Sequence, residues 1–331
     1  MKLGILDQSP ISDDQTPHEA LRATMKLAQT AESLGYTRFW AAEHHGLPGL
    51  ASSVPEVMLG YIGANTDKIR IGSGAVLLPY YKPYKVAETY NMLGTLFPGR
   101  VDIGVGRAPG GPAEVSEALS DNFLQSVFRM PDLLKDLIRY VDDADEKIKA
   151  GPVPPERPDI WMLGTSRKSA KAAAGNGLYY AFGQFMSDAE GKDVIDEYRK
   201  AFKPRSERQG SYAIITLSVI CAETNEMAAK LAYSCLIWQV KKDKEGEFEN
   251  LPSLEAAEAA VLSPEEKKQV DGMKNQMIIG DPATVKQELE KIHEETGADE
   301  IMIVTLTHSP EDKRESYRLI AEQFDLGKYD R

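Results

Sequence analysis

The stretch that decides the fold is Phe39-Trp40-Ala41-Ala42-Glu43-His44-His45. An apolar, aromatic run ends here in one carboxylate and two histidines, which is typical of a buried strand that delivers titratable groups to a cleft. Two similar endings follow along the chain, at residues 69–79 and 101–107. Polar or glycine-rich residues at the ends of successive parallel strands predict an active site at one rim of an α/β barrel.

Short apolar runs alternate with helix-like segments along the whole chain. Several runs are almost continuously apolar, as expected of parallel strands that are covered on both faces. The strand candidates are residues 2–6, 37–42, 69–77, 100–105, 159–163, 178–182, 212–221 and 300–305. Eight parallel strands close a (β/α)8 TIM barrel, and a chain of 331 residues suits such a barrel with insertions.

Two regions break this alternation. Residues 108–130 form a long connection after the fourth strand, and residues 241–277 form a charged one after the seventh. Long connections in a compact domain usually act as lids or as interface elements. We therefore expect a single domain over residues 1–331, with the segment 241–277 as an insertion that covers the site.

Several helix starts follow one pattern, a Ser or Thr at the N-cap with an acidic residue three positions further on. These starts are Thr16, Ser187, Ser263 and Ser309. We expect a helix to begin directly after each of them.

The composition excludes several classes of partner. A net charge of −12 argues against nucleic acid or a membrane surface, because both are polyanionic. Cys221 and Cys235 provide no disulfide framework and fit a reducing compartment. The N-terminus lacks the apolar core of a signal peptide, and no apolar run approaches the roughly 18 residues of a membrane span. We therefore expect a cytoplasmic protein.

His44 and His45 suit acid/base chemistry better than metal binding. Neighbouring residues on a strand point to opposite faces, so the two rings are poorly placed to bind one ion together. We expect one histidine to point into the barrel mouth, where its ionisation near neutral pH suits proton transfer, and the other to pack or hydrogen-bond outside. The alternative is that both histidines are structural. We expect no metal site.

The glycine-rich strand ends do not fit a dinucleotide-binding fingerprint. After Gly72-Ser73-Gly74-Ala75, Leu77 takes the place of the third glycine and no helix begins, and Pro109 takes that place in the run from Gly104. A Rossmann domain is therefore disfavoured. Small residues at a strand end let a flat ligand approach closely, which favours a smooth platform beside a planar ring.

Residues 163–169 lead from a strand end into an alanine-rich helix. Free backbone N–H groups at a helix N-terminus, together with hydroxyl groups, form a good anion pocket. The Walker pattern is absent, so one phosphomonoester fits better than a nucleoside triphosphate. Arg107 is expected to supply the counter-charge. A plain N-cap explains Ser166 equally well.

Taken in order, these motifs resemble the bacterial luciferase-like flavin-dependent monooxygenases, whose fold is a TIM barrel with an insertion after strand seven. The resemblance spans nearly the whole chain. It is most specific at residues 40–45, 71–79, 99–107 and 163–166. The chain is more similar to the uncharacterised single-chain members of the family than to the light-emitting subunits.

The resemblance implies a role for particular residues. His44 corresponds to the family's catalytic or substrate-side histidine, and Gly74-Ala75 to a non-prolyl cis peptide bond against the flavin ring. The remaining cofactor-binding residues, of which all but Gly106 surround the FMN phosphate, are Gly106, Arg107, Gly164, Thr165, Ser166 and Ser169. Light-emitting luciferases carry a reactive cysteine where this chain has Gly106, which argues against light emission and long-chain aldehyde oxidation.

The resemblance also implies a reaction. We expect a two-component monooxygenase, in which a separate NAD(P)H-dependent flavin reductase supplies reduced FMN and one oxygen atom of O2 enters a small organic substrate. His44 is expected to handle the proton, and the family implies a homodimer. Two alternatives stay open: a deazaflavin (F420)-dependent dehydrogenase on the same fold, and a flavin-binding protein without catalysis.

Overall fold

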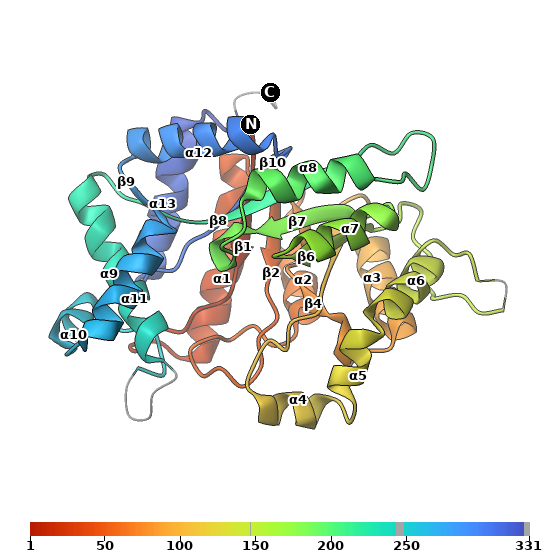
Figure 1. Ribbon diagram of the computed structural model, residues 1–331, viewed down its shortest axis with the longest axis horizontal. Coiled ribbons are helices and arrows are strands. Elements are labelled where there is room, and N and C mark those ends of the chain that lie inside the picture. Colours follow the sequence, from red (N-terminus) through yellow and green to blue (C-terminus); the bar gives the residue numbers. More distant parts are fainter. Residues whose placement is uncertain (146, 243–247, 328–331) are drawn as a thin grey trace.

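The apolar runs of the sequence form a closed parallel barrel in a computed structural model, which describes residues 1–145, 147–242 and 248–327. The strands are β1 (Lys2–Asp7), β2 (Arg38–Ala41), β3 (Arg70–Ser73), β4 (Val76–Leu77), β5 (Val101–Gly106), β6 (Asp159–Gly164), β7 (Tyr179–Gly183), β8 (Ala213–Cys221), β9 (Ile278–Gly280) and β10 (Glu300–Val304). β10 pairs in parallel with both β1 and β8, and this pairing closes the barrel (Figure 1). The predicted TIM barrel is confirmed.

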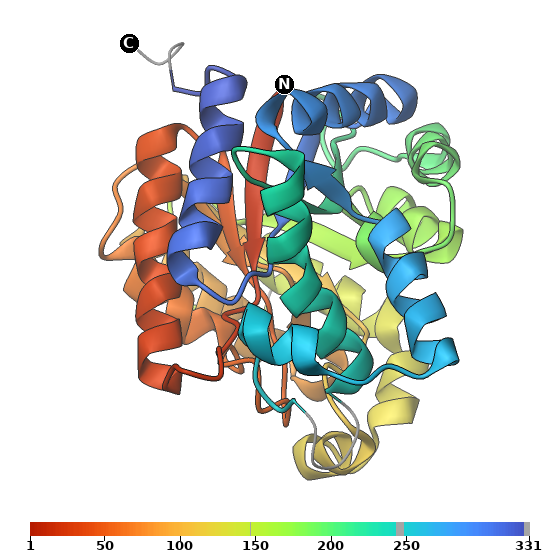
Figure 2. The same ribbon diagram turned by 90° about the vertical axis from the view of Figure 1, so that its left-hand side faces the viewer.

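Helices cover the outside of the barrel. They are α1 (Pro17–Leu34), α2 (Pro55–Gly63), α3 (Pro83–Leu96), α4 (Ala113–Leu119), α5 (Phe123–Phe128), α6 (Met130–Val141), α7 (Arg167–Gly175), α8 (Gly191–Ala201), α9 (Asn225–Lys241), α10 (Leu254–Ala259), α11 (Pro264–Asn275), α12 (Pro282–Thr296) and α13 (Pro310–Gln323), with short 3-10 turns η1 (Leu78–Tyr80) and η2 (Gln184–Met186). Figure 2 shows α1 beside α13, the first and last helices of the chain. None of the described helices combines the length and apolar composition that crossing a bilayer requires.

The predicted helix starts are confirmed at three of four positions. Thr16 and Ser263 form capping boxes, and the Ser309 side chain accepts a hydrogen bond from the backbone N–H of Asp312. The start predicted at Ser187 is wrong, because α8 begins only at Gly191. The Ser187 hydroxyl instead donates to the backbone carbonyl of Thr165 at 2.9 Å, so it links two strand-end loops.

The third barrel strand is interrupted where the glycine-rich run lies. The sequence predicted one strand over residues 69–77, but β3 ends at Ser73 and β4 resumes at Val76. Between them, the Gly74–Ala75 peptide bond is cis, as the family resemblance implied. The sequence reading also missed β9, a three-residue strand that pairs with the far end of β8 and is too short to give a periodic signal.

A network of buried ion pairs fills the end of the barrel where the strands begin. Arg38 donates to Asp102 at 2.7 Å and to Glu300 at 2.9 Å, and all three side chains are buried. Asp102 also accepts from the Trp40 indole at 3.0 Å and from Arg70 at 2.5 Å. Paired and hydrogen-bonded charges of this kind can stay buried, and they fill this end with protein side chains.

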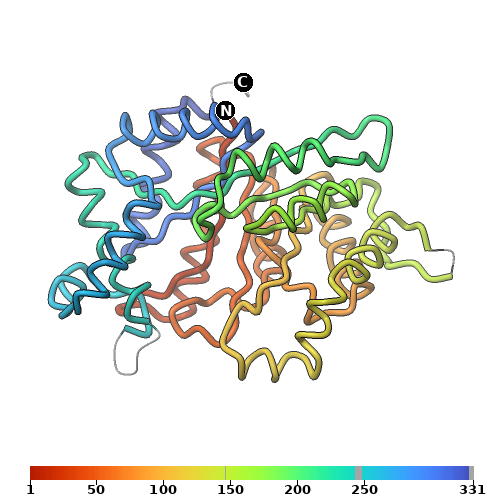
Figure 3. Tube along the Cα trace, viewed as in Figure 1, coloured from red at the N-terminus to blue at the C-terminus, as the bar shows by residue number. Residues whose placement is uncertain are grey.

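The two predicted insertions follow the fourth and seventh barrel strands. α4 and α5 follow β5 and lie below the barrel in Figure 1, whereas α10 and α11 follow the long helix α9 and lie at the left of the same view. The same path can be followed along the chain trace (Figure 3). Residues 243–247 of the expected lid segment lie outside the described residues, and its role as a lid stays a prediction.

Candidate functional site

All the predicted site residues line one cavity at the ends of the barrel strands. The cavity has a volume of about 330 Å³. The lining residues that the sequence singled out are His44, Gly74, Ala75, Gly106, Arg107, Gly164, Thr165, Ser166 and Ser169. They come from the ends of β2, β3, β5 and β6, so the strand-end pattern of the sequence corresponds to a single concave surface.

His44 lies at the wall of this cavity, directly after β2. Its backbone N–H donates to the carbonyl of Ser52 at 2.9 Å, while its buried Nδ1 atom has no hydrogen-bond partner among the described residues. Burial lowers the pKa of His44 to about 4, with smaller contributions from the charges of Lys242 and His45. The imidazole is therefore neutral at neutral pH.

Glu43 fixes the loop that carries His44. This buried carboxylate accepts hydrogen bonds from the Leu77 backbone N–H at 3.0 Å and from the Tyr81 hydroxyl at 2.7 Å. The His45 Nε2 atom lies 2.8 Å from the same carboxylate. His44 thus lines the cavity, whereas His45 does not line it and contacts Glu43 instead. This agrees with the expectation that neighbouring strand residues point to opposite sides.

Small residues form a flat part of the cavity wall. A Cβ atom added to Gly106 would lie 3.3 Å from the Ala75 Cβ, and one added to Gly74 would lie 2.5 Å from the Leu6 side chain. The cis peptide bond between Gly74 and Ala75 lies in the same wall. These residues leave room for a planar ring, and a larger side chain at Gly74 would displace its neighbour.

The opposite part of the cavity has the features of an anion site. Ser166 caps α7, and its side chain and that of Ser169 form a capping box. The Ser169 hydroxyl also lies 3.0 Å from the Tyr180 hydroxyl, so it is engaged within the protein. The Thr165 hydroxyl makes no hydrogen bond among the described residues, and the first turn of a helix leaves N–H groups without intrahelical acceptors. Exposed Arg107 adds positive charge at the cavity edge.

A second cavity of about 260 Å³ adjoins the first. The two share His44, Gln8 and the turn residues Phe185 and Met186. The rest of the second cavity is built from β8, from the residues at the end of β10, from the helices α9 and α11 with the residues after them, and from Leu47 and Leu50 in the loop after β2. His44 therefore lies at the boundary of the two cavities. The first cavity contains the anion site at the start of α7, and the second is lined in part by α9 and α11.

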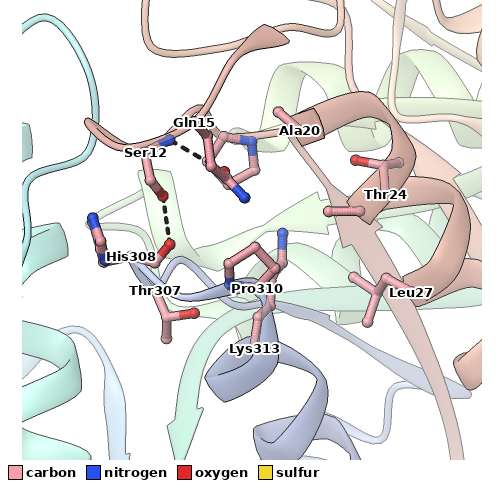
Figure 4. A pocket seen from close by; sticks show the side chains of 11 residues that line it. Ser12, Gln15, Ala20, Thr24, Leu27, Thr307, His308, Pro310 and Lys313 are labelled. Carbon is pink, nitrogen blue, oxygen red and sulfur yellow. Dashed lines mark hydrogen bonds between the residues drawn. The ribbon is translucent and has the colours of Figure 1, made fainter. Parts of the chain in front are cut away.

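A third, smaller hollow lies between α1 and the start of α13 (Figure 4). Its volume is about 20 Å³, which leaves room for about one water molecule. At its edge, His308 lies 2.6 Å from Asp13 and 3.4 Å from Asp14, and these are the groups among the described residues whose ligand atoms lie close enough to hold a metal ion. Both carboxylates are exposed, and the hydrogen bond between His308 and Asp13 accounts for the cluster.

Sequence reasoning missed several residues that line the cavities. Gln8 directly follows β1, so the rule that strand ends carry function would have found it. Thr216 lies within β8, and Lys242 lies at the end of α9, where the sequence shows only a charged run. Their positions depend on how distant segments pack, and no local pattern reveals that.

Comparison with known proteins identifies the family. The family described as luciferase-like monooxygenase matches residues 1–300. The chain belongs to the luciferase-like monooxygenase family. It is 41% identical to the uncharacterized protein YwcH of Bacillus subtilis, over 98% of this chain and 99% of that protein. It is 36% identical to the N-acetyl-S-alkylcysteine monooxygenase of the same organism, over 97% and 98% of the two chains. These matches support a monooxygenase.

Solved structures agree on the fold of this luciferase-like monooxygenase. Apo-MsnO8 superimposes with a TM-score of 0.91 at 35% identity, covering 98% of each chain. Two structures below 20% identity share the fold alone. The oxygenating constituent of 3,6-diketocamphane monooxygenase from Pseudomonas putida, in complex with FMN, has a TM-score of 0.69, 19% identity and coverage of 97% of both chains. An F420-dependent secondary alcohol dehydrogenase with an F420-acetone adduct has a TM-score of 0.67, 15% identity and coverage of 97% of this chain and 98% of its own. Members of this fold therefore use flavin or deazaflavin cofactors.

Proposed function

We propose that this chain is the oxygenase of a two-component monooxygenase, which uses reduced FMN and O2 to oxygenate a small organic substrate. One observation carries the proposal: a flat glycine-lined wall, a helix N-terminus with Arg107, and the side chain of His44 all line a single cavity. FMN has the matching parts, which are a planar ring, a phosphomonoester and polar ring atoms.

The residues present fit this cofactor. The phosphate would be held by the first turn of α7 together with Thr165, Ser166 and Arg107. Gly164 has no side chain, so the backbone there can approach the phosphate. A Cβ atom at Gly164 would lie 2.2 Å from the Ser169 Oγ atom, so only glycine leaves the cap of this helix intact. Bound reduced FMN supplies the two electrons with which O2 is activated.

His44 is the group of this chain that would handle the proton. Because burial keeps the imidazole neutral and His44 lines both cavities, the ring would exchange a proton or a hydrogen bond with a ligand at their junction. The apolar residues around His44 would keep water out of the cavity. Activated oxygen would then be transferred to the substrate and not lost as hydrogen peroxide. Glu43 keeps the loop in place through its three hydrogen bonds.

Flavin titration and oxygen uptake test this proposal together. The purified chain is titrated anaerobically with FMN and with reduced FMN, and oxygen uptake is then measured with each reduced cofactor. We expect reduced FMN to bind and to support substrate-dependent oxygen uptake. Turnover with reduced F420 and none with reduced FMN would indicate the dehydrogenase. Binding of FMN without any turnover, unchanged by His44→Ala, would indicate a flavin-binding protein.

The proposal includes partners. A separate NAD(P)H-dependent flavin reductase would supply the reduced FMN, so adding such a reductase is expected to sustain turnover. The relative that acts on N-acetyl-S-alkylcysteines suggests a thioether of this type as the first substrate to assay.

A homodimer is the assembly we propose. Val57 on α2 and both Met92 and Leu96 on neighbouring α3 are 54–69% exposed, which is a large apolar area to leave in water. Sedimentation equilibrium is expected to give twice the chain mass, and Leu96→Asp is expected to shift the protein toward the monomer.

A further inference from the structure

We propose that the second cavity binds the substrate and that Lys242 selects an organic carboxylate there. This inference rests on the proposed function, since the cavity adjoins the chamber assigned to FMN, and it names the class of substrate. The juxtaposition that carries it is one cation at a chamber with both polar and apolar walls, where no described lining residue is acidic.

The charge of the chamber is unusual for this protein. The chain carries 51 Asp and Glu against 39 Lys and Arg, yet Lys242 is the single charged side chain among the described residues that line the second cavity. Its other polar lining groups are neutral, among them Gln239, Gln276 and Ser218. A positive cavity in an acidic protein attracts an anion.

Lys242 is available to a ligand. It directly follows α9, and its ammonium lies 5.3 Å from the centre of the Trp238 ring. Among the described residues it makes no ion pair, whereas the preceding Lys241 is buried and paired with Glu266. A cation held beside an aromatic ring at the wall of a cavity would form a charge-assisted hydrogen bond with a ligand carboxylate within reach.

The remaining walls define the rest of the ligand. Trp238, Met273, Met277 and Leu306 line the chamber between Lys242 and the barrel. His44 and Met186 belong to both cavities, so the apolar body of a ligand anchored at Lys242 extends toward the chamber assigned to the cofactor. A volume of about 260 Å³ suits a small monoanion with one apolar arm.

The test compares carboxylic acids with their uncharged amides. The full chain with FMN is titrated with octanoate, 4-phenylbutanoate and N-acetyl-S-benzylcysteine, and with the amide of each, by calorimetry and by tryptophan fluorescence. We expect at least one acid to bind roughly tenfold more tightly than its amide, as a charge-assisted contact requires. In Lys242→Met and Lys242→Gln this preference should disappear. Lys274→Met removes an exposed cation of α11 that does not line the chamber, and it should keep the preference.

The outcomes separate this inference from the proposed function. If no acid binds, if acid and amide bind equally, or if the preference survives in both Lys242 variants, the inference is wrong. FMN affinity is measured on the same samples and should stay within about twofold in the Lys242 variants. Failure of the wild-type chain to bind FMN would overturn the proposed function instead, whatever the acids do.

Discussion

Protonation of His44 should lower the free energy of unfolding, because the folded protein lowers the pKa of this buried imidazole. Burial of the imidazole, helped by the charges of Lys242 and His45, lowers its pKa from 6.5 to about 4. In the unfolded chain the ring takes up a proton below about pH 6.5, but in the folded chain it does so only below about pH 4. The unfolded state therefore binds more protons in this interval, and stability falls as the pH falls through it.

The magnitude follows from the same pKa values. A drop from 6.5 to about 4 corresponds to about 3 kcal/mol, lost progressively between pH 6.5 and pH 4 and constant below. Other groups also titrate there, so the informative quantity is the difference between wild type and His44→Gln. We expect this difference in unfolding free energy to change by about 3 kcal/mol between pH 7 and pH 4.

Urea unfolding at several pH values measures this difference, and an imidazole NMR titration locates its cause. His18→Gln is the matched control, because His18 is exposed on α1 and does not line the cavity. Lys242→Met should raise the pKa of His44, since it removes one of the charges that lower it. If the His44 resonance titrates near pH 6.5 in the wild type, or if His44→Gln leaves the pH dependence of stability unchanged, the reasoning is refuted.

Three further substitutions test the cofactor site and the barrel. Arg107→Gln should weaken FMN binding roughly tenfold, as expected for loss of one charged contact to a phosphate, and fluorescence titration measures it. Gly104→Ala should cost about 3 kcal/mol in unfolding free energy, because its Cβ atom would lie 1.9 Å from the Ser73 carbonyl oxygen. Arg38→Met should cost about 4 kcal/mol, because it leaves the buried Glu300 carboxylate without its cation and the buried Asp102 carboxylate with Arg70 alone.

Each of these substitutions has a matched control. Arg129→Gln removes an exposed arginine that does not line the cavity, and equal loss of FMN affinity there would contradict the phosphate assignment. Gly60→Ala lies in α2 with its nearest contact at 4.0 Å and should stabilise the chain by about 0.5 kcal/mol. Arg318→Met breaks surface ion pairs and should cost less than about 1 kcal/mol. If Gly104→Ala or Arg38→Met costs no more than its control, the packing argument fails.

Much of the fold could be read from the sequence because a parallel strand covered on both faces is apolar along its length. Each barrel strand matches an apolar run to within a residue or two, except where the cis bond after Gly74 divides the third one. Ser187 shows the limit of local signals. Its pattern satisfies the N-cap rule, yet its hydroxyl bonds a neighbouring loop, and α8 begins four residues later.

Site residues that directly follow a strand could be predicted from the sequence, whereas residues that tertiary packing brings to the site could not. His44 and Ser166 follow strands directly, so the strand-end rule places them at one rim. The engagement of the Ser169 hydroxyl by Tyr180 depends on how helix α7 packs against strand β7. Lys242 faces the second cavity only because α9 folds back over the barrel mouth, and a charged run in the sequence does not disclose that.

The most direct test of the central claim is a crystal structure of this chain grown with FMN. We predict density for one FMN at the carboxyl-end mouth of the barrel, with the ring against Gly74 and Ala75 and the phosphate at the start of α7 beside Arg107. Density at another place, or none at a saturating concentration of FMN, would contradict the claim.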